Sequence, residues 1–154
     1  MVEDVVPALD RGSNRDLAAG LASLFARYGH DALVVPFIDA FPRIGHAAGR
    51  SAVLFFLIRF AREQSAVVDL ATRALTDEAE LVRREACAVL AFSLREDVLP
   101  ALEALASRPD DAAREWAVAA MDAITHRNHH YFLDRAHTGT IRWTPDAPDR
   151  GSTG

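Results

Sequence analysis

The sequence predicts an all-α protein, a right-handed stack of about three and a half helical hairpins closed by a small C-terminal β-hairpin. Short helical segments separated by glycine, proline and capping residues indicate the helices. Similar segments recur along the chain, which indicates stacked hairpins. Aromatic and β-branched residues after Asn128 indicate the β-hairpin. We therefore expect one domain over 1–143, with helices over about 13–127, the hairpin over about 130–143 and a flexible tail over 144–154.

Caps and breakers delimit the predicted helices. Ser13 can cap the first helix, and Gly29 can end it. Pro36 would kink or restart the second, whereas Ser65 and Asp110 are candidate caps for later helices. The predicted helices cover about residues 14–28, 31–41, 47–63, 65–75, 78–94, 96–107 and 111–127.

The pattern changes near the C-terminus. Residues 131–135 and 140–143 are rich in aromatic and β-branched side chains, and the four residues between them end in Gly139. This pattern predicts two strands joined by a short loop. Alternation would place four side chains on one apolar face, which we expect to pack against the last helix: Tyr131, Leu133, Ile141 and Trp143.

An internal repeat organises the middle of the chain. The segment that begins Val82-Arg83 aligns with Ala113-Arg114 at an offset of 31 residues and with Gly49-Arg50 at an offset of 33. Second helices follow, one of which opens with Val98-Leu99-Pro100-Ala101-Leu102. Over about residues 47–125 these segments resemble HEAT-like (armadillo-type) repeats. The resemblance implies stacked hairpins whose second helices line a concave face.

The C-terminal part has a resemblance of its own. The stretch 128–135, with Thr138, Gly139 and Trp143, is similar to the ends of small bacterial HEAT-like proteins. Some of those proteins are associated with toxin-immunity loci. This resemblance implies a bacterial immunity or antitoxin-like protein.

Composition excludes several classes of function. The net charge is −5, and all 17 basic residues are arginine. Without lysine, the chain can form neither a Schiff base nor a lysine-containing phosphate-binding loop. Cys87 is the single cysteine and lies in an apolar run, so we expect a buried thiol and no intramolecular disulfide. The N-terminus has no signal-peptide pattern, and we expect a cytoplasmic protein without a cofactor.

Acidic residues concentrate in the predicted second helices. These helices contain six acidic residues and one basic residue. Their summed charge of −5 equals the net charge of the whole chain. Together with the resemblance, this implies an acidic concave face that repels nucleic acid and binds a basic protein, for example a toxin. The candidate partner-binding residues are Asp31, Asp39, Asp69, Arg73, Glu96, Asp97 and Glu103.

A histidine cluster offers an alternative function. Imidazoles and a carboxylate are suitable ligands for zinc or another divalent metal. Such a site would make the chain a small metal-dependent enzyme or a cofactor-handling protein, whereas a non-enzymatic binding module needs no metal. A third possibility is a structural module that assembles with itself. The candidate metal ligands are His126, His129, His130, Asp134 and His137.

Overall fold

The computed structural model describes residues 2–145, in which helices and turns are the only regular elements. The all-α prediction is therefore confirmed. The chain divides into two compact units, residues 1–56 (unit 1) and 57–154 (unit 2), which are described separately. No helix within 2–145 has the length and apolar character needed to cross a membrane.

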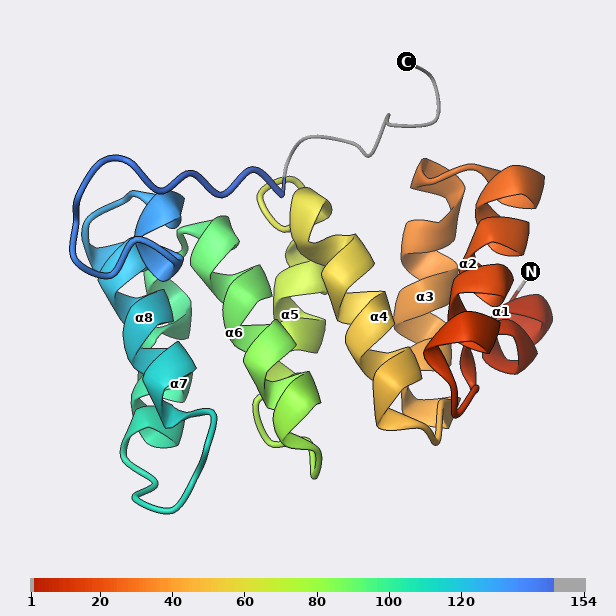
Figure 1. The fold of residues 1–154 in the computed structure, drawn as a ribbon, viewed down its shortest axis with the longest axis horizontal. Helices are drawn as coiled ribbons and strands as arrows, with labels where there is room; N and C mark the ends of the chain where they lie inside the picture. The colour runs from red at the N-terminus through yellow and green to blue at the C-terminus, as the bar shows by residue number, and fades with distance from the viewer. Residues whose placement is uncertain (1, 146–154) are drawn as a thin grey trace. The chain divides into compact units, whose positions relative to one another are not determined.

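Unit 1 contains the N-terminal helices, drawn in red to orange in Figure 1. Ser13 accepts a hydrogen bond from the Asp16 N–H, and Gly29 ends the following helix with φ 76°, as predicted. The predicted helix over 31–41 is instead an α-helix flanked by two 3₁₀ turns. The elements of unit 1 are α1 (Val2–Leu9), α2 (Asn14–Tyr28), η1 (Asp31–Leu33), α3 (Val34–Ala40), η2 (Phe41–Arg43) and α4 (Ala47–Leu57), the last of which extends to the start of unit 2.

Helix α1 was not predicted, and glycine allows it to pack. A Cβ added at Gly20 would lie 2.0 Å from the Ala8 carbonyl oxygen, and one at Gly49 would lie 2.1 Å from the Leu9 carbonyl oxygen. Only glycine permits such close contact between backbones. The approach buries Leu9 completely, together with Val5 on the same helix.

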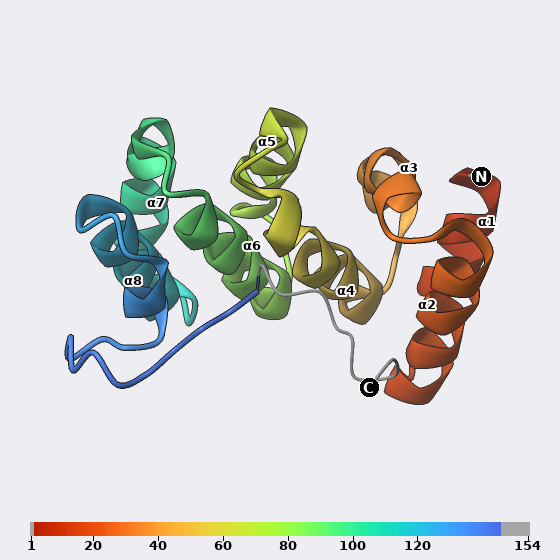
Figure 2. The same ribbon diagram turned by 90° about the horizontal axis from the view of Figure 1, so that it is seen from above.

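Unit 2 contains two layers of helices. Seen from above in Figure 2, α5 and α7 form one layer, and α6 and α8 form the other. Helix α6 contacts both α5 and α8, and its buried side chains, among them Phe92 and Leu90, form much of the core. The elements of unit 2 are η3 (Ile58–Phe60), α5 (Ser65–Ala74), α6 (Glu80–Ser93), η4 (Glu96–Val98), α7 (Leu99–Ala106), α8 (Arg114–Thr125) and η5 (His129–Phe132).

Two of the three aligned arginines of the internal repeat have matching contacts. In unit 1, Arg50 donates from Nη1 to the carbonyl oxygens of residues 44 and 45, at 3.0 and 2.9 Å. In unit 2, Arg83 donates to those of residues 77 and 78, at 2.9 and 3.1 Å. Each arginine therefore satisfies two backbone acceptors in the turn that leads into its own helix. This shared role explains the arginine in these two copies of the repeat, whereas Arg114, the aligned residue of the third copy, is the first residue of α8.

Two predicted helix caps differ from the structure. Ser65 is the first residue of α5 rather than its cap, and Gln64 in the cap position makes no side-chain cap bond. Near α8, Asp111 rather than Asp110 accepts the Ala113 N–H, at 2.9 Å. The same Asp111 oxygen lies 3.1 Å from Arg83 Nη2, which ties this turn to α6.

The predicted C-terminal β-hairpin is wrong. Residues 129–132 form a 3₁₀ helix, and no strand occurs between there and residue 145. The backbone groups that a β-ladder would use bind side chains instead: the Trp143 N–H donates to His130 Nδ1, and the Thr138 and Gly139 N–H groups donate to Asp134. The expected apolar face of the hairpin is also absent, because Leu133 and Ile141 are exposed whereas Phe132, which lies outside that face, is buried. In the predicted tail over 144–154, residues 146–154 lie outside the described part.

Candidate functional site

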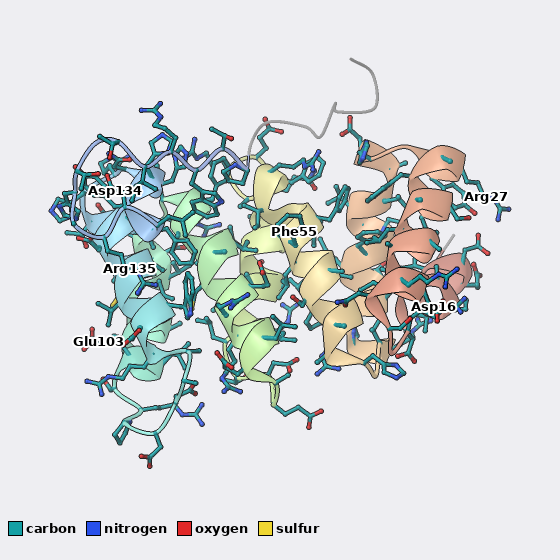
Figure 3. The ribbon with its side chains drawn as sticks, in the orientation of Figure 1. Asp16, Arg27, Phe55, Glu103, Asp134 and Arg135 are labelled. Carbon is teal, nitrogen blue, oxygen red and sulfur yellow. The ribbon has the colours of Figure 1, made fainter. Side chains whose placement is uncertain are left out.

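The candidate partner-binding residues are all exposed, and they lie on the second helices of the two units. Asp31 and Asp39 belong to η1 and α3 of unit 1. In unit 2, Asp69 and Arg73 lie on α5, Glu96 and Asp97 on η4, and Glu103 on α7. Figure 3 shows Glu103 projecting away from its helix. The expected location on second helices therefore holds within each unit.

The four candidate partner-binding acids of unit 2 fall into two classes. Glu96 lies 3.9 Å from Arg127 Nη1, and Asp97 accepts two hydrogen bonds from Arg95. The Arg95 guanidinium holds the pKa of Asp97 below its ordinary value. Asp69 and Glu103, in contrast, form no ion pair with another residue in the described range 2–145. The unpaired carboxylates are thus Asp69 and Glu103, on adjacent helices of one layer.

Two of the candidate metal ligands hold the C-terminal segment in place. His129 Nδ1 lies 2.8 Å from Arg62 Nη2, and His129 Nε2 lies 2.9 Å from the Trp143 carbonyl oxygen. Since arginine only donates, Nδ1 accepts and Nε2 carries the proton. His130 Nδ1 accepts the Trp143 N–H at 3.0 Å. Both rings therefore bind backbone groups of Trp143, His129 also binds Arg62, and we call the two residues the anchoring histidines.

The Trp143 indole completes this anchor. Its ring lies 5.0 Å from Phe132 and 6.2 Å from Phe92, centroid to centroid. The Arg62 guanidinium lies 3.9 Å above the Phe92 ring and donates to the Phe92 carbonyl oxygen at 2.8 Å. The segment after η5 is therefore fastened to α6 by aromatic packing and hydrogen bonds rather than by a β-ladder.

Asp134 organises the loop between η5 and residue 140. Its Oδ1 accepts the Thr138 N–H and hydroxyl, and its Oδ2 accepts the Gly139 N–H, all within 2.9 Å. Burial alone would raise the pKa of Asp134, but these hydrogen bonds outweigh it and hold the pKa below the ordinary value. Asp134 is thus a loop-organising residue whose two oxygens are already engaged.

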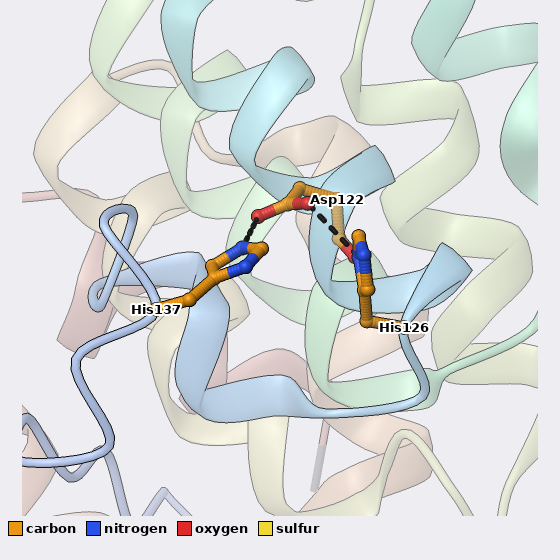
Figure 4. A group of neighbouring side chains, drawn as sticks. All are labelled: Asp122, His126 and His137. Atoms are coloured by element: carbon orange, nitrogen blue, oxygen red, sulfur yellow. Dashed lines mark hydrogen bonds and ion pairs between the residues drawn. The ribbon is translucent and has the colours of Figure 1, made fainter.

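The other two histidines converge on a residue that the sequence analysis did not include among the metal ligands. His126 Nδ1 lies 3.0 Å from Asp122 Oδ1 and also 3.0 Å from the Asp122 backbone carbonyl oxygen. His137 Nε2 lies 2.7 Å from Asp122 Oδ2. Figure 4 shows the carboxylate between the two rings. Asp122 and His126 are four residues apart near the end of α8, a spacing that places them on one helix face. That spacing was the available signal for Asp122, whereas His137 comes from a distant loop. We call these three residues the Asp122 cluster.

A groove of about 780 Å³ lies beside this cluster, along the exposed side of α8. Asp122 and His137 line one part of it, and charged residues line another, including Arg114, Glu115 and Arg135. Val118 adds an apolar surface that is 51% exposed. The Asp122 cluster is therefore open to a space large enough for a small ligand or a peptide side chain.

Cys87 has no role at either location. Its thiol is fully buried in α6, as predicted, and burial raises its pKa to about 12. A neutral, buried thiol is a poor nucleophile and a poor metal ligand.

Comparison with known proteins identifies the repeats. The family model for HEAT repeats matches residues 36–122, which is more than half of the 154 residues. No curated protein and no solved structure matches the chain. The matched range includes the arginine of the Gly49-Arg50 segment, most of α3, and the second helices α5 and α7. The chain belongs to the HEAT repeat family, whose members are commonly protein-interaction modules.

Proposed function

We propose that this chain is a non-enzymatic binding module that recognises a basic protein through carboxylates on its second helices. The observation that carries the proposal is the pair of exposed, unpaired acids Asp69 and Glu103 on α5 and α7. Because these carboxylates form no ion pair in the described part of the chain, binding arginine or lysine breaks no existing ion pair, although the charge of Arg95 also acts on Asp69. Asp31 and Asp39 extend the same proposal to the second helices of unit 1.

The paired acids should contribute less. Arg95 and Arg127 already neutralise much of the local field of Asp97 and Glu96, so a cationic partner would have to displace an arginine at each position. Arg73, on the same helix as Asp69, would select against a partner with a cation directly opposite it. The sequence predicted one acidic surface, and on this proposal the unpaired acids contribute more to binding than the paired ones.

The test uses two double variants with the same change in net charge. D69N/E103Q removes the unpaired acids, and E96Q/D97N removes the paired ones. Wild type and both variants are used as bait in lysate of the source organism, at low and at moderate salt, and the association rate of the captured basic protein is then measured. We expect D69N/E103Q to slow association about tenfold or more and E96Q/D97N to change it by a few-fold at most.

Two outcomes would contradict the proposal. Equal slowing by both variants would mean that net charge rather than position governs association. An unchanged rate and salt dependence for D69N/E103Q would exclude this surface altogether.

The immunity role is one specific version of this proposal, in which the basic partner is a toxin. Its support is the C-terminal resemblance around residues 128–143, together with the acidic second helices. Co-expression of the captured partner with wild type or with D69N/E103Q tests it: protection by wild type, and its loss in the variant, is the expected result. A partner that harms no cells would leave a binding module without an immunity role.

A further inference from the structure

We infer that the Asp122 cluster is a binding site for a divalent transition-metal ion of the zinc type. The three side chains offer one ligating atom each, and these atoms all lie within 4.8 Å of one another. Asp122 lies on α8, His126 directly follows that helix, and His137 lies in the loop after η5. This juxtaposition is independent of the acidic second helices and of the partner proposed for them.

The donor atoms select the class of metal. Two imidazole nitrogens and one carboxylate favour zinc and similar ions, whereas magnesium and calcium prefer oxygen ligands alone. Asp122 presents one oxygen to each ring, at 3.0 and 2.7 Å, so its carboxylate already lies between the two nitrogens. An ion would replace the hydrogen bond between His137 and the Asp122 carboxylate, and His126 Nδ1 would exchange its contact with the Asp122 backbone carbonyl oxygen for the ion.

Hydrogen bonds within its loop hold His137 in a defined position. His137 has φ 57°, a left-handed conformation that non-glycine residues rarely adopt. Its N–H donates to the Asp134 carbonyl oxygen at 3.1 Å, and the Asp134 carboxylate ties down the two residues that follow. An uncommon backbone conformation that is stabilised from several sides is often found at functional sites. Here it aims Nε2 at Asp122.

Tyr131 fixes the orientation of both rings. Its ring stacks on His137 with a centroid distance of 3.8 Å and an interplanar angle of 10°, and it meets His126 edge-on at 5.6 Å. The imidazoles are thereby restrained before any ion arrives, which lowers the entropic cost of binding.

The cluster supplies three protein ligands, so a four-coordinate ion would keep one position for water or another ligand. Asp122 and His137 also line the groove along α8, which gives that position a path to solvent. The site therefore has the composition of an open metal site rather than of a closed structural one.

The test is titration of the full-length, untagged, chelator-treated chain with Zn²⁺ by calorimetry, with Mg²⁺ as the comparison ion. The chain offers a matched control: His46 is also exposed and also bound to a single aspartate, with Nδ1 2.6 Å from Asp10. We expect one Zn²⁺ per wild-type chain, no response to Mg²⁺, and at least about tenfold weaker Zn²⁺ binding in H126Q and in H137Q. H46Q and D69N/E103Q should bind Zn²⁺ as wild type does.

A second measurement distinguishes loss of the metal site from loss of the fold. Zn²⁺ should raise the Tm of wild type and of H46Q but not that of H126Q, which changes an exposed residue at the end of α8. Co²⁺ in place of Zn²⁺ should give visible absorption bands that H126Q weakens. Wild type that takes up no Zn²⁺, or variants of the Asp122 cluster that bind it as tightly as H46Q does, would overturn the inference.

Discussion

The anchoring histidines and the Asp122 cluster contain the same residue type, within twelve positions of one another, in different environments. His129 and His130 direct nitrogen atoms at a backbone amide, a carbonyl group and an arginine. His126 and His137 direct theirs at a single carboxylate beside a groove. The first pair replaces the β-ladder that the C-terminal segment lacks, and the second pair is available to a ligand. The comparison shows that the contacts of a histidine, rather than its place in a cluster along the chain, decide whether it supports the fold or a site.

The largest effect should come from removing the aromatic part of the anchor. Trp143→Ala deletes the ring that packs against Phe132 and Phe92, and we expect it to lower the free energy of unfolding by about 2–4 kcal/mol. Urea denaturation with circular dichroism measures the change. A loss too small to resolve would mean that the segment after η5 is not fastened to α6.

A pair of double variants tests the comparison directly. H129Q/H130Q removes hydrogen bonds to Trp143 backbone groups, and we expect a loss of about 1–3 kcal/mol of stability. H126Q/H137Q removes exposed pairs with Asp122, and without metal it should cost about 0.5 kcal/mol or less. Both variants replace two histidines by the same residue, so thermal melts under metal-free conditions can be compared directly. Equal losses would remove the distinction between the two groups.

A local effect on the loop that carries His137 should come from Asp134→Asn. The amide keeps one acceptor oxygen for Thr138 but cannot accept the Gly139 N–H, so the loop loosens without losing all its bonds. We expect a lower Tm than wild type at neutral pH and weaker Zn²⁺ binding, because His137 is positioned by this loop.

The pH dependence of that difference follows from the lowered pKa of Asp134. An aspartate with a folded-state pKa below its unfolded value stabilises the fold above about pH 4, and this contribution is lost as the pH falls through the folded-state pKa. The difference in Tm between wild type and D134N should therefore shrink in acid. A difference that stays constant from neutral pH to pH 3 would mean that the carboxylate charge is not involved.

Much of the helical architecture was predictable because its signals are local. Apolar spacing, the Ser13 cap and Gly29 indicated α2, and the repeat offset identified Arg50 and Arg83 as equivalent residues. The role of these arginines was not predictable, since it depends on which carbonyl groups the preceding turn presents. Helix α1 was missed because its packing depends on backbone contact at two glycines far along the chain.

The sequence by itself determined the all-α character of the repeats, the repeat family, the location of the acids on second helices and the burial of Cys87, whereas its prediction of a C-terminal β-hairpin was wrong. These properties depend on periodicity, composition and residue spacing. Tertiary structure alone decided which acids are paired, that residues 129–132 wind into a helix, and that Asp122 meets His126 and His137. Each of these results from contacts between segments separated along the chain, and hydrogen bonds to side chains such as Asp134 and His130 outweighed the local β-propensity of the C-terminal segment.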